Sequence, residues 1–456
     1  MNDPKPTSPV SWSAAIRTFL KIAIHSFGGP AGQIAVMHRV LVEEKKWISE
    51  SRFLHALNYC MLLPGPEATQ LITYVGWLMH RTLGGIVAGA LFVLPGFVSI
   101  LALSILYAGY RDTTLVAAVF YGIKPAVLAI VVEALLRIGR RALKTRAMVL
   151  TAVAAFIAIF FFAVPFPIII LSAGLLGLLI ARPSTATSLA NDDDGDTDDS
   201  KQFIIDAALR DGRLTHVHPT AAGSVRNGVI WLTLWSLPFV LLAALGMTES
   251  LFFKQAGFFS KMAVVTFGGA YSVLTYVAQQ AVDVYGWLKP GQMLDGLGLA
   301  ETTPGPLIQV VQFVGFMGAY QNPGTLHPVT AGVISSLVVV WVTYIPCFLW
   351  IFVGAPYMEA LRRNPHLRAS LTAITAAVVG VILNLAVWFS IHTLFAPVET
   401  RRVYGMNLLI PEWAKLDLPG LLIAIASAVV LLRFKWGMLR TLAAAALIGL
   451  LHHRLR

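Results

Sequence analysis

Two stretches of the chain carry the same interruptions in the same order, and this duplication limits the folds available to it. Residues 19–66 contain Phe27-Gly28-Gly29, Trp47 and Pro64-Gly65-Pro66. Residues 259–306 contain Phe267-Gly268-Gly269, Trp287 and Pro304-Gly305-Pro306, each 240 residues after its counterpart. Gly and Pro interrupt helices when they fall inside apolar sequence. Two such units in one chain predict broken helices, with a binding site where two repeats meet.

Composition places these interruptions in a membrane. The chain of 456 residues is 57% hydrophobic and only 12% charged, whereas a soluble domain carries about 25% charged residues. A helix of about 20 apolar residues crosses the hydrocarbon core of a bilayer. On that measure the apolar runs predict an all-α polytopic membrane protein with about 13 membrane segments.

The remaining composition disfavours several classes of protein. A net charge of +11 fits Lys and Arg kept on cytoplasmic loops, and no basic patch interleaved with aromatic residues indicates nucleic acid. Cys60 and Cys347 lie in apolar segments without partners at metal-ligand spacing. We therefore expect packing cysteines, no metal and no other cofactor. The sequence holds no nucleotide-binding, zinc-protease or nucleophile motif, which disfavours an enzyme.

The chain divides into two membrane repeats joined by a polar loop. We predict an N-terminal membrane repeat at residues 12–181, a connecting membrane segment at 227–257 and a C-terminal membrane repeat at 258–456. Residues 182–226 hold an acidic run that starts at Asp192. The preferred interpretation of this stretch is a solvated and partly disordered linker. A cation site and a regulatory tail are the alternatives.

A basic run after the fourth apolar segment sets the orientation. It contains Arg137, Arg140, Arg141, Lys144 and Arg146, and such clusters stay in the cytoplasm. Counting segments from there places the N-terminus and the linker 182–226 in the cytoplasm. A single crossing between the halves then gives two inverted-topology repeats. Whether the first two segments of each half cross the membrane or re-enter it stays open.

The broken helices also indicate what would bind between the repeats. In hydrocarbon, such breaks occur only beside protein or water. A helix that starts at a break presents free N–H groups and the positive end of its dipole, which favour an anion. Kinks that serve packing alone are the alternative. The glycines predicted to line this anion site are Gly28, Gly29, Gly65, Gly268, Gly269 and Gly305.

Polar side chains within the apolar segments extend the candidate site. Lys21 and Lys261 occupy equivalent positions of the two stretches, and with Lys124 they would neutralise an anion. Alternatively, these lysines only reach toward the membrane interface. Amides and hydroxyls near the breaks would donate hydrogen bonds to an anion; they belong to Gln33, Gln70, Gln309, Thr302 and Thr303.

Two carboxyl groups near the breaks are candidate proton carriers. Glu67 follows Pro66, and Glu301 precedes Thr302. A carboxyl group beside an incoming anion gains from protonation, although Glu67 would also complement the helix dipole without any further role. Leu307 stands at the position equivalent to Glu67, so the two halves are not chemically identical.

Five stretches around these motifs resemble the chromate ion transporter family in its long two-domain form. They are residues 27–33, 61–67, 84–95, 266–271 and 302–306, and the resemblance extends over nearly the whole chain apart from the acidic linker. It implies a multi-pass protein of the bacterial inner (cytoplasmic) membrane, with two homologous halves of opposite topology. It further implies efflux of chromate, which confers chromate resistance, with sulfate as the isosteric competitor.

The energetics of a dianion agree with export. A cytoplasm-negative potential of 100 mV contributes about 2.3 kcal/mol per charge, so efflux needs no further drive, whereas uptake needs coupled cations. A proton-coupled importer of sulfate or another oxyanion and a passive anion channel are the alternative functions. A membrane scaffold without transport is the least favoured. The sequence does not determine which ion is coupled to transport or whether the protein forms a homodimer.

Overall fold

The computed structural model describes residues 10–180, 203–217, 220–267, 269–358, 365–395 and 398–455. Helices make up most of this part of the chain, as predicted. Five of them are long and apolar enough to cross a bilayer, and they begin at Glu67, Thr114, Ala221, Pro328 and Ala369. The total of about 13 segments and the inverted topology stay predictions. Gly268 and the acidic run lie outside the described residues.

The first repeat consists of short helices around the breaks, followed by longer ones. Ser11 caps α1 through its side chain, and Gly28 precedes α2 with Pro30 in the first turn. The elements are α1 (Trp12–His25), α2 (Gly29–His38), the π-helix η1 (Arg39–Glu44), α3 (Glu50–Cys60), α4 (Glu67–Tyr110), α5 (Thr114–Ala142), α6 (Arg146–Phe162) and α7 (Phe166–Ile180).

The second repeat follows the same order after α9 (Ala221–Ala244). Its π-helix η5 (Gln279–Val284) begins and ends 240 residues after η1, so the likeness extends to an uncommon backbone form. The other elements are α10 (Leu251–Val265), α11 (Ala270–Ala278), α12 (Pro290–Thr302), η6 (Leu307–Gln309), α13 (Val310–Gln321), α14 (Pro328–Gly354), η7 (Ala355–Tyr357), α16 (Pro365–Leu394), η8 (Trp413–Lys415), α17 (Leu418–Leu432) and α18 (Met438–Leu455).

The helices beside the breaks are too short to cross the bilayer alone. An α-helix rises about 1.5 Å per residue and the hydrocarbon core is about 30 Å thick. The longest of these helices, α10, has 15 residues, and α11 has only 9. By length, none of these helices spans the hydrocarbon core by itself.

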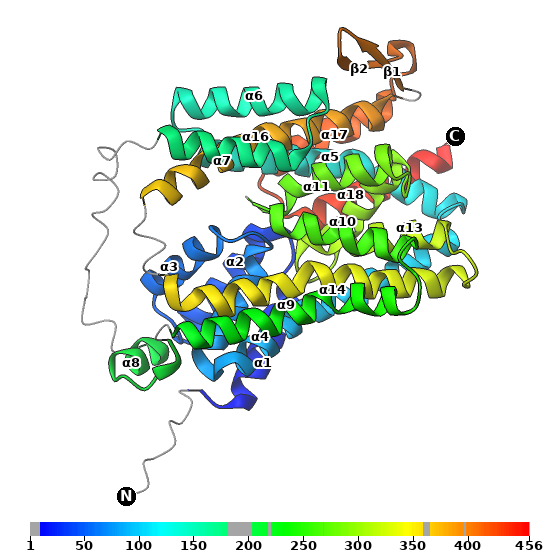
Figure 1. Cartoon of the computed structure of the whole chain (residues 1–456). Coiled ribbons are helices and arrows are strands. Elements are labelled where there is room, and N and C mark those ends of the chain that lie inside the picture. The colour runs from blue at the N-terminus through cyan, green and yellow to red at the C-terminus, as the bar shows by residue number, and fades with distance from the viewer. Residues whose placement is uncertain are drawn as a thin grey trace, which may run out of the picture.

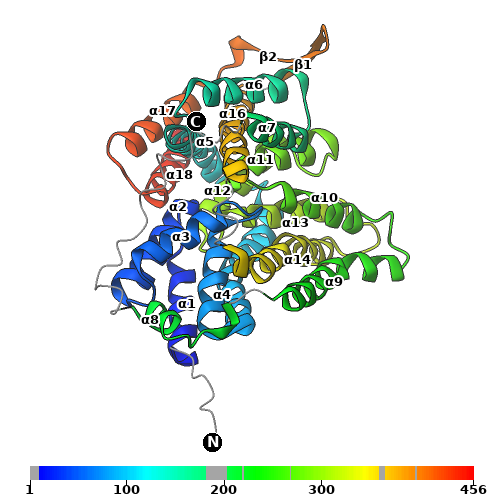
Figure 2. The ribbon, with the colours of Figure 1, turned by 60° about the vertical axis from the view of Figure 1, so that its left-hand side comes forward.

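The helices pack in two groups, and each group contains helices of both repeats. In Figures 1 and 2, α5, α6, α7, α16, α17 and α18 form one group, and α1 and α4 lie with α9, α10, α13 and α14 in another. Within the first group, α6 and α7 pack on α16, whereas α17 and α18 pack on α5. Gly122 of α5 allows this close approach, because a Cβ on it would lie 1.9 Å from the Ala445 carbonyl oxygen.

The element α4 is two helices joined by a sharp bend. Helical geometry is lost at His80 and Arg81. The two arms then pack against each other, since a Cβ on Gly76 would lie 2.4 Å from the Gly84 carbonyl oxygen. The arm that starts at Glu67 is therefore a short helix as well, and the arm that ends at Tyr110 keeps the length of a membrane-crossing helix.

Two segments with secondary structure have no counterpart in the sequence-based expectations. Within the predicted linker, α8 (Ile204–Arg210) and the 3₁₀ turn η4 (Thr215–Val217) are ordered and packed on the first repeat. After α16, β1 (Val398–Val403) and β2 (Met406–Pro411) form an antiparallel hairpin in which Val398 pairs with Pro411. Tyr404 and Gly405 both have positive φ, as a two-residue hairpin turn requires.

Candidate functional site

The interrupted segments of the two repeats meet through a reciprocal pair of backbone hydrogen bonds. The N–H of Gly65 donates to the carbonyl oxygen of Thr266 over 2.8 Å, and the N–H of Gly305 donates to that of Ser26 over 2.9 Å. The two donors lie 240 residues apart in the sequence, and so do the two acceptors, so the bonds are equivalent in the two repeats. The glycine of each PGP motif is therefore bound just before the FGG motif of the other repeat, and the breaks form one centre.

Glycine is required at these positions by backbone conformation. The φ angles of Gly28, Gly29, Gly65, Gly269 and Gly305 are all positive, between 72° and 119°. Space is restricted as well, because a Cβ on Gly305 would lie 3.2 Å from the backbone of Gly96. The local sequence thus forces the chain to end one helix and start another at this centre.

Residues 67 and 307 each face the helix start of the opposite repeat. A Cβ on Gly269, which caps α11, would lie 3.4 Å from Oε1 of Glu67. A Cβ on Gly29, at the start of α2, would lie 3.8 Å from Cδ2 of Leu307. The same geometry therefore places a carboxylate at one helix N-terminus and an aliphatic side chain at the other. A carboxylate there is stabilised by the helix dipole.

A second carboxyl group reaches the start of α2 through a tyrosine. The hydroxyl of Tyr271 donates to Oε1 of Glu301, and both side chains are buried. The Tyr271 hydroxyl would lie 3.6 Å from a Cβ on Gly29. Oε2 of Glu301 is buried without a hydrogen-bond partner among the described residues. Burial of an unpaired charge is costly, so this oxygen has an unmet need for a donor.

The predicted amides support the backbone of the breaks. Nε2 of Gln33 donates to the carbonyl oxygen of Gly305 over 2.8 Å, and Nε2 of Gln70 donates to that of Pro64 over 2.7 Å. Gln309 is held by Gln312 and accepts from the hydroxyl of Tyr344 over 2.6 Å. In this conformation these three amides fix the geometry of the centre.

The two predicted threonine hydroxyls bond within their own helix. Oγ1 of Thr302 donates to the carbonyl oxygen of Leu299 over 2.8 Å, and Oγ1 of Thr303 donates to that of Ala300 over 3.1 Å. Both hydroxyl hydrogens are therefore engaged in hydrogen bonds at the C-terminal end of α12.

The three predicted lysines occupy separate places. Lys21 is exposed, and its Nζ lies 2.7 Å from Oε2 of Glu44 on η1. Lys261 is also exposed. Lys124 lies 3.4 Å from Oδ1 of Asp295, whose Oδ2 accepts a hydrogen bond from Tyr107 over 2.7 Å. The structure thus brings Lys124 to a carboxylate on α12, and the role of each lysine toward an anion stays a prediction.

Asp295 and Tyr271 are site residues that the sequence analysis did not identify. Asp295 is 4% exposed and connects α12 to α5 and α4. An Asp among apolar and glycine residues at 293–300 is a usable signal, because a charge inside the membrane is expensive. Tyr271 gives no comparable signal, since tyrosines are common in apolar segments.

Comparison with known proteins identifies relatives along most of the chain. The sequence model of the family described as "Chromate transporter" matches residues 13–178 and 253–450. The "Chromate transport protein" of Pseudomonas aeruginosa is 32% identical over 379 residues, which cover 82% of this chain and 80% of the relative. The protein of the same description from Cupriavidus metallidurans is 26% identical over 99% of this chain and all of its own length.

A cyanobacterial relative adds to these. The "Probable chromate transport protein" of Synechococcus elongatus is 30% identical over 90% of this chain and 92% of its own. No solved structure matches the chain significantly. Both family matches include the breaks and the helices that they join, and together they cover well over half of the sequence. The chain belongs to the chromate transporter family.

Proposed function

We propose that the protein is a secondary transporter that exports chromate, accepts sulfate as an analogue and confers chromate resistance. The observation that supports this most strongly is the reciprocal pair of glycine hydrogen bonds, because it gathers the interrupted helices of both repeats at one centre. Helix N-termini converging at one centre suit a small oxyanion. The names of the relatives supply chromate as the substrate.

In this proposal the two repeats have inverted topology, and the protein works by alternating access in the bacterial inner membrane. The N-terminus and the linker 182–226 lie in the cytoplasm, on the same side as the basic run at 137–146. The dianion binds among the starts of α2, α4, α11 and η6, where the N–H groups lie. It leaves the cytoplasm down the electrical gradient, which supplies about 2.3 kcal/mol per charge at 100 mV.

A proton-linked importer of sulfate or another oxyanion is the second candidate. Two carboxyl groups favour it, since Glu67 faces the start of α11 and Glu301 reaches the start of α2 through Tyr271. The membrane potential opposes entry of a dianion. Two coupled protons cancel its charge, so net uptake requires at least two of them. Protonation of these carboxyl groups would supply the carriers.

Flux in proteoliposomes separates the two. We expect radiolabelled chromate to move with an imposed voltage, to saturate and to be inhibited by sulfate. Flux that follows a proton gradient and ignores voltage would favour the importer. Flux that does not saturate would indicate a channel, and chromate movement no faster than in empty vesicles would contradict transport altogether.

A further inference from the structure

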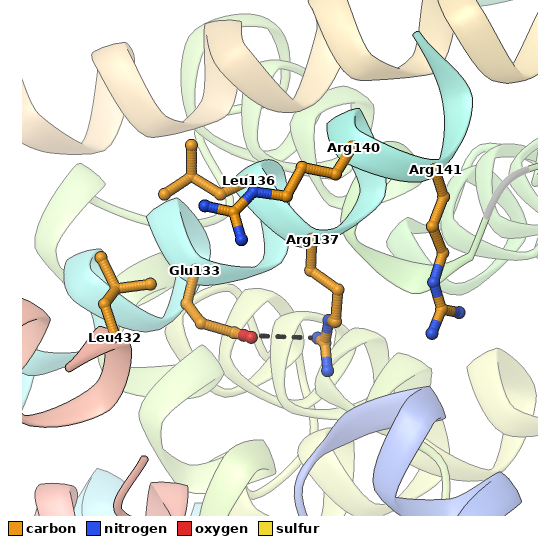
Figure 3. A pocket seen from close by; sticks show the side chains of 6 residues that line it. All are labelled: Glu133, Leu136, Arg137, Arg140, Arg141 and Leu432. Atoms are coloured by element: carbon orange, nitrogen blue, oxygen red, sulfur yellow. Dashed lines mark ion pairs between the residues drawn. The ribbon is translucent and has the colours of Figure 1, made fainter. Parts of the chain in front are cut away.

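A crevice at the end of α5 contains a group of charges that the site described above does not use. It has a volume of about 300 Å³ and is lined by Glu133, Leu136, Arg137, Arg140 and Arg141 of α5 and by Leu432 of α17. Arg137 and Arg141 are four residues apart and so share one side of the helix, whereas the side chain of Arg140 runs along α5 toward Leu136 (Figure 3). Figure 3 shows Glu133, Arg137 and Arg141 pointing from α5 to the same side. Membrane orientation alone does not require this shared side.

The charges in the crevice are only partly compensated. Nη2 of Arg137 lies 3.5 Å from Oε2 of Glu133, which accepts no hydrogen bond from the described residues. Arg140 and Arg141 are exposed and form no ion pair within the described part of the chain. Three guanidinium groups and one carboxylate leave two positive charges, which would balance the charge of a tetrahedral dianion.

The crevice lies within electrostatic range of the centre between the repeats. Arg137 and Glu133 both interact electrostatically with Glu301 and Tyr271, the pair that reaches the start of α2. Arg137 is only partly exposed, whereas Arg140 and Arg141 are exposed, so its charge is the one among the three arginines that acts on the buried pair.

We propose that Arg137, Arg140 and Arg141 form a capture site, in which an oxyanion binds before it moves to the helix starts. Arginine suits this role because its planar fork of N–H groups matches two oxygens of an oxyanion. Glu133 competes with the ligand for Arg137. That the ligand is a transported oxyanion rests on the proposed function, whereas the preference for a dianion follows from the charges in the crevice.

The test uses the full chain in vesicles of phosphatidylcholine alone, with chromate presented on one side at a time. Arg140→Gln combined with Arg141→Gln should raise the half-saturating chromate concentration about tenfold, the lower range of electrostatic steering, only on the side that bears 137–146. Glu133→Gln should lower that concentration. The matched control is Arg146→Gln, which removes a positive charge of the same basic run at the start of α6, outside the crevice.

Three results would overturn the capture site. The double variant would behave like Arg146→Gln, or its half-saturating concentration would rise equally on both sides. As the third such result, the double variant would differ from Arg146→Gln only after phosphatidylglycerol is added, which would show that the arginines bind lipid phosphate. If the unaltered protein moves no chromate, the proposed function fails, and equilibrium binding of radiolabelled chromate to the purified chain tests the capture site. The double variant should then bind less than Arg146→Gln, and equal binding would overturn the site alone.

Discussion

The two repeat-equivalent hairpins, α2–η1–α3 and α11–η5–α12, differ in what covers them. α11 packs on α16, and α12 packs on α5, α16 and α18, whereas α2 and α3 pack chiefly on α1 and α4 of their own repeat. All nine residues of α11 are buried, compared with three of the ten in α2. One hairpin is thus enclosed by the other helix group and its counterpart is not.

This difference indicates which contacts would have to change during transport. Because the hairpins are related by the 240-residue offset, a conformation in which their surroundings are exchanged is a natural second state. In the present state the Lys124–Asp295 pair joins α12 to α5, and the segment at 203–217 covers the start of α3. We infer that the Lys124–Asp295 contact has to separate when these surroundings are exchanged.

The largest effect is expected where both hairpins meet. Gly305→Ala forces a side chain onto a φ of +99° and brings its Cβ to 3.2 Å from the Gly96 backbone. Such strain costs about 1–3 kcal/mol, and we expect chromate flux to fall at least tenfold. Gly324→Ala is the matched control, with a φ of +61° and open space around it. Equal flux in both variants would refute a special role for the reciprocal glycine bonds.

The next largest effect concerns the enclosed hairpin. Asp295→Asn removes the charged partner of Lys124, and breaking this partly buried ion pair favours separation of the two elements. In a chain without Cys60 and Cys347, a Leu297→Cys reporter, buried in α12, should then react about tenfold faster with a thiol reagent, a shift of about 1.4 kcal/mol.

Glu412→Gln is the control for this second prediction, because it breaks the more exposed Lys415–Glu412 pair of 2.8 Å. It should leave labelling of the reporter unchanged. Equal acceleration in both variants would show that Asp295 does not hold α12 against α5.

A moderate effect is expected from the carboxylate that distinguishes the two helix starts. Glu67 faces Gly269, whereas Leu307 faces Gly29. An ionised Glu67 repels an incoming dianion, so Glu67→Gln should raise flux several-fold at alkaline pH and flatten its pH dependence. Leu307→Gln, with an amide at the equivalent position, is the control. An unchanged pH profile in Glu67→Gln would remove this residue from proton coupling.

The smallest effect on flux is expected at the segment that covers the first hairpin. The carboxylate of Asp206 accepts from the N–H of Ser49 over 2.9 Å and lies 2.6 Å from Nε of Arg52. Asp206→Asn should weaken this docking by about 1–3 kcal/mol. Amide exchange in α8 should accelerate correspondingly, while flux changes less than about twofold. Asp211→Asn breaks the exposed pair with Arg213 and is the control, which should leave amide exchange in α8 unchanged. Equal amide exchange of α8 in both variants would contradict the docking role.

Local signals in the sequence were sufficient to locate the breaks. Gly and Pro restrict the backbone wherever they occur, so the ends of α1 and α10 and the starts of α2 and α4 could be predicted closely. The constant offset also predicted that equivalent breaks would be related. Their reciprocal pairing, from Gly65 to Thr266 and from Gly305 to Ser26, needed the structure.

Contacts between distant segments could not be predicted in the same way. The pairs Lys124–Asp295 and Tyr271–Glu301 depend on how α12 lies against other helices, and no periodicity in the sequence encodes this. Docking of α8 was missed because a polar loop gives the same composition whether or not it packs. The hairpin at 398–411 was missed although Tyr404-Gly405 is a recognisable turn.

The central claim is that the helix starts of both repeats form one oxyanion site, and the anomalous scattering of chromium tests it most directly. Crystals of the full chain soaked with chromate should show one anomalous peak between Gly29 and Gly269, within hydrogen-bond distance of the N–H groups that begin α2 and α11. A transport-competent protein whose peaks all lie away from these helix starts would contradict the account.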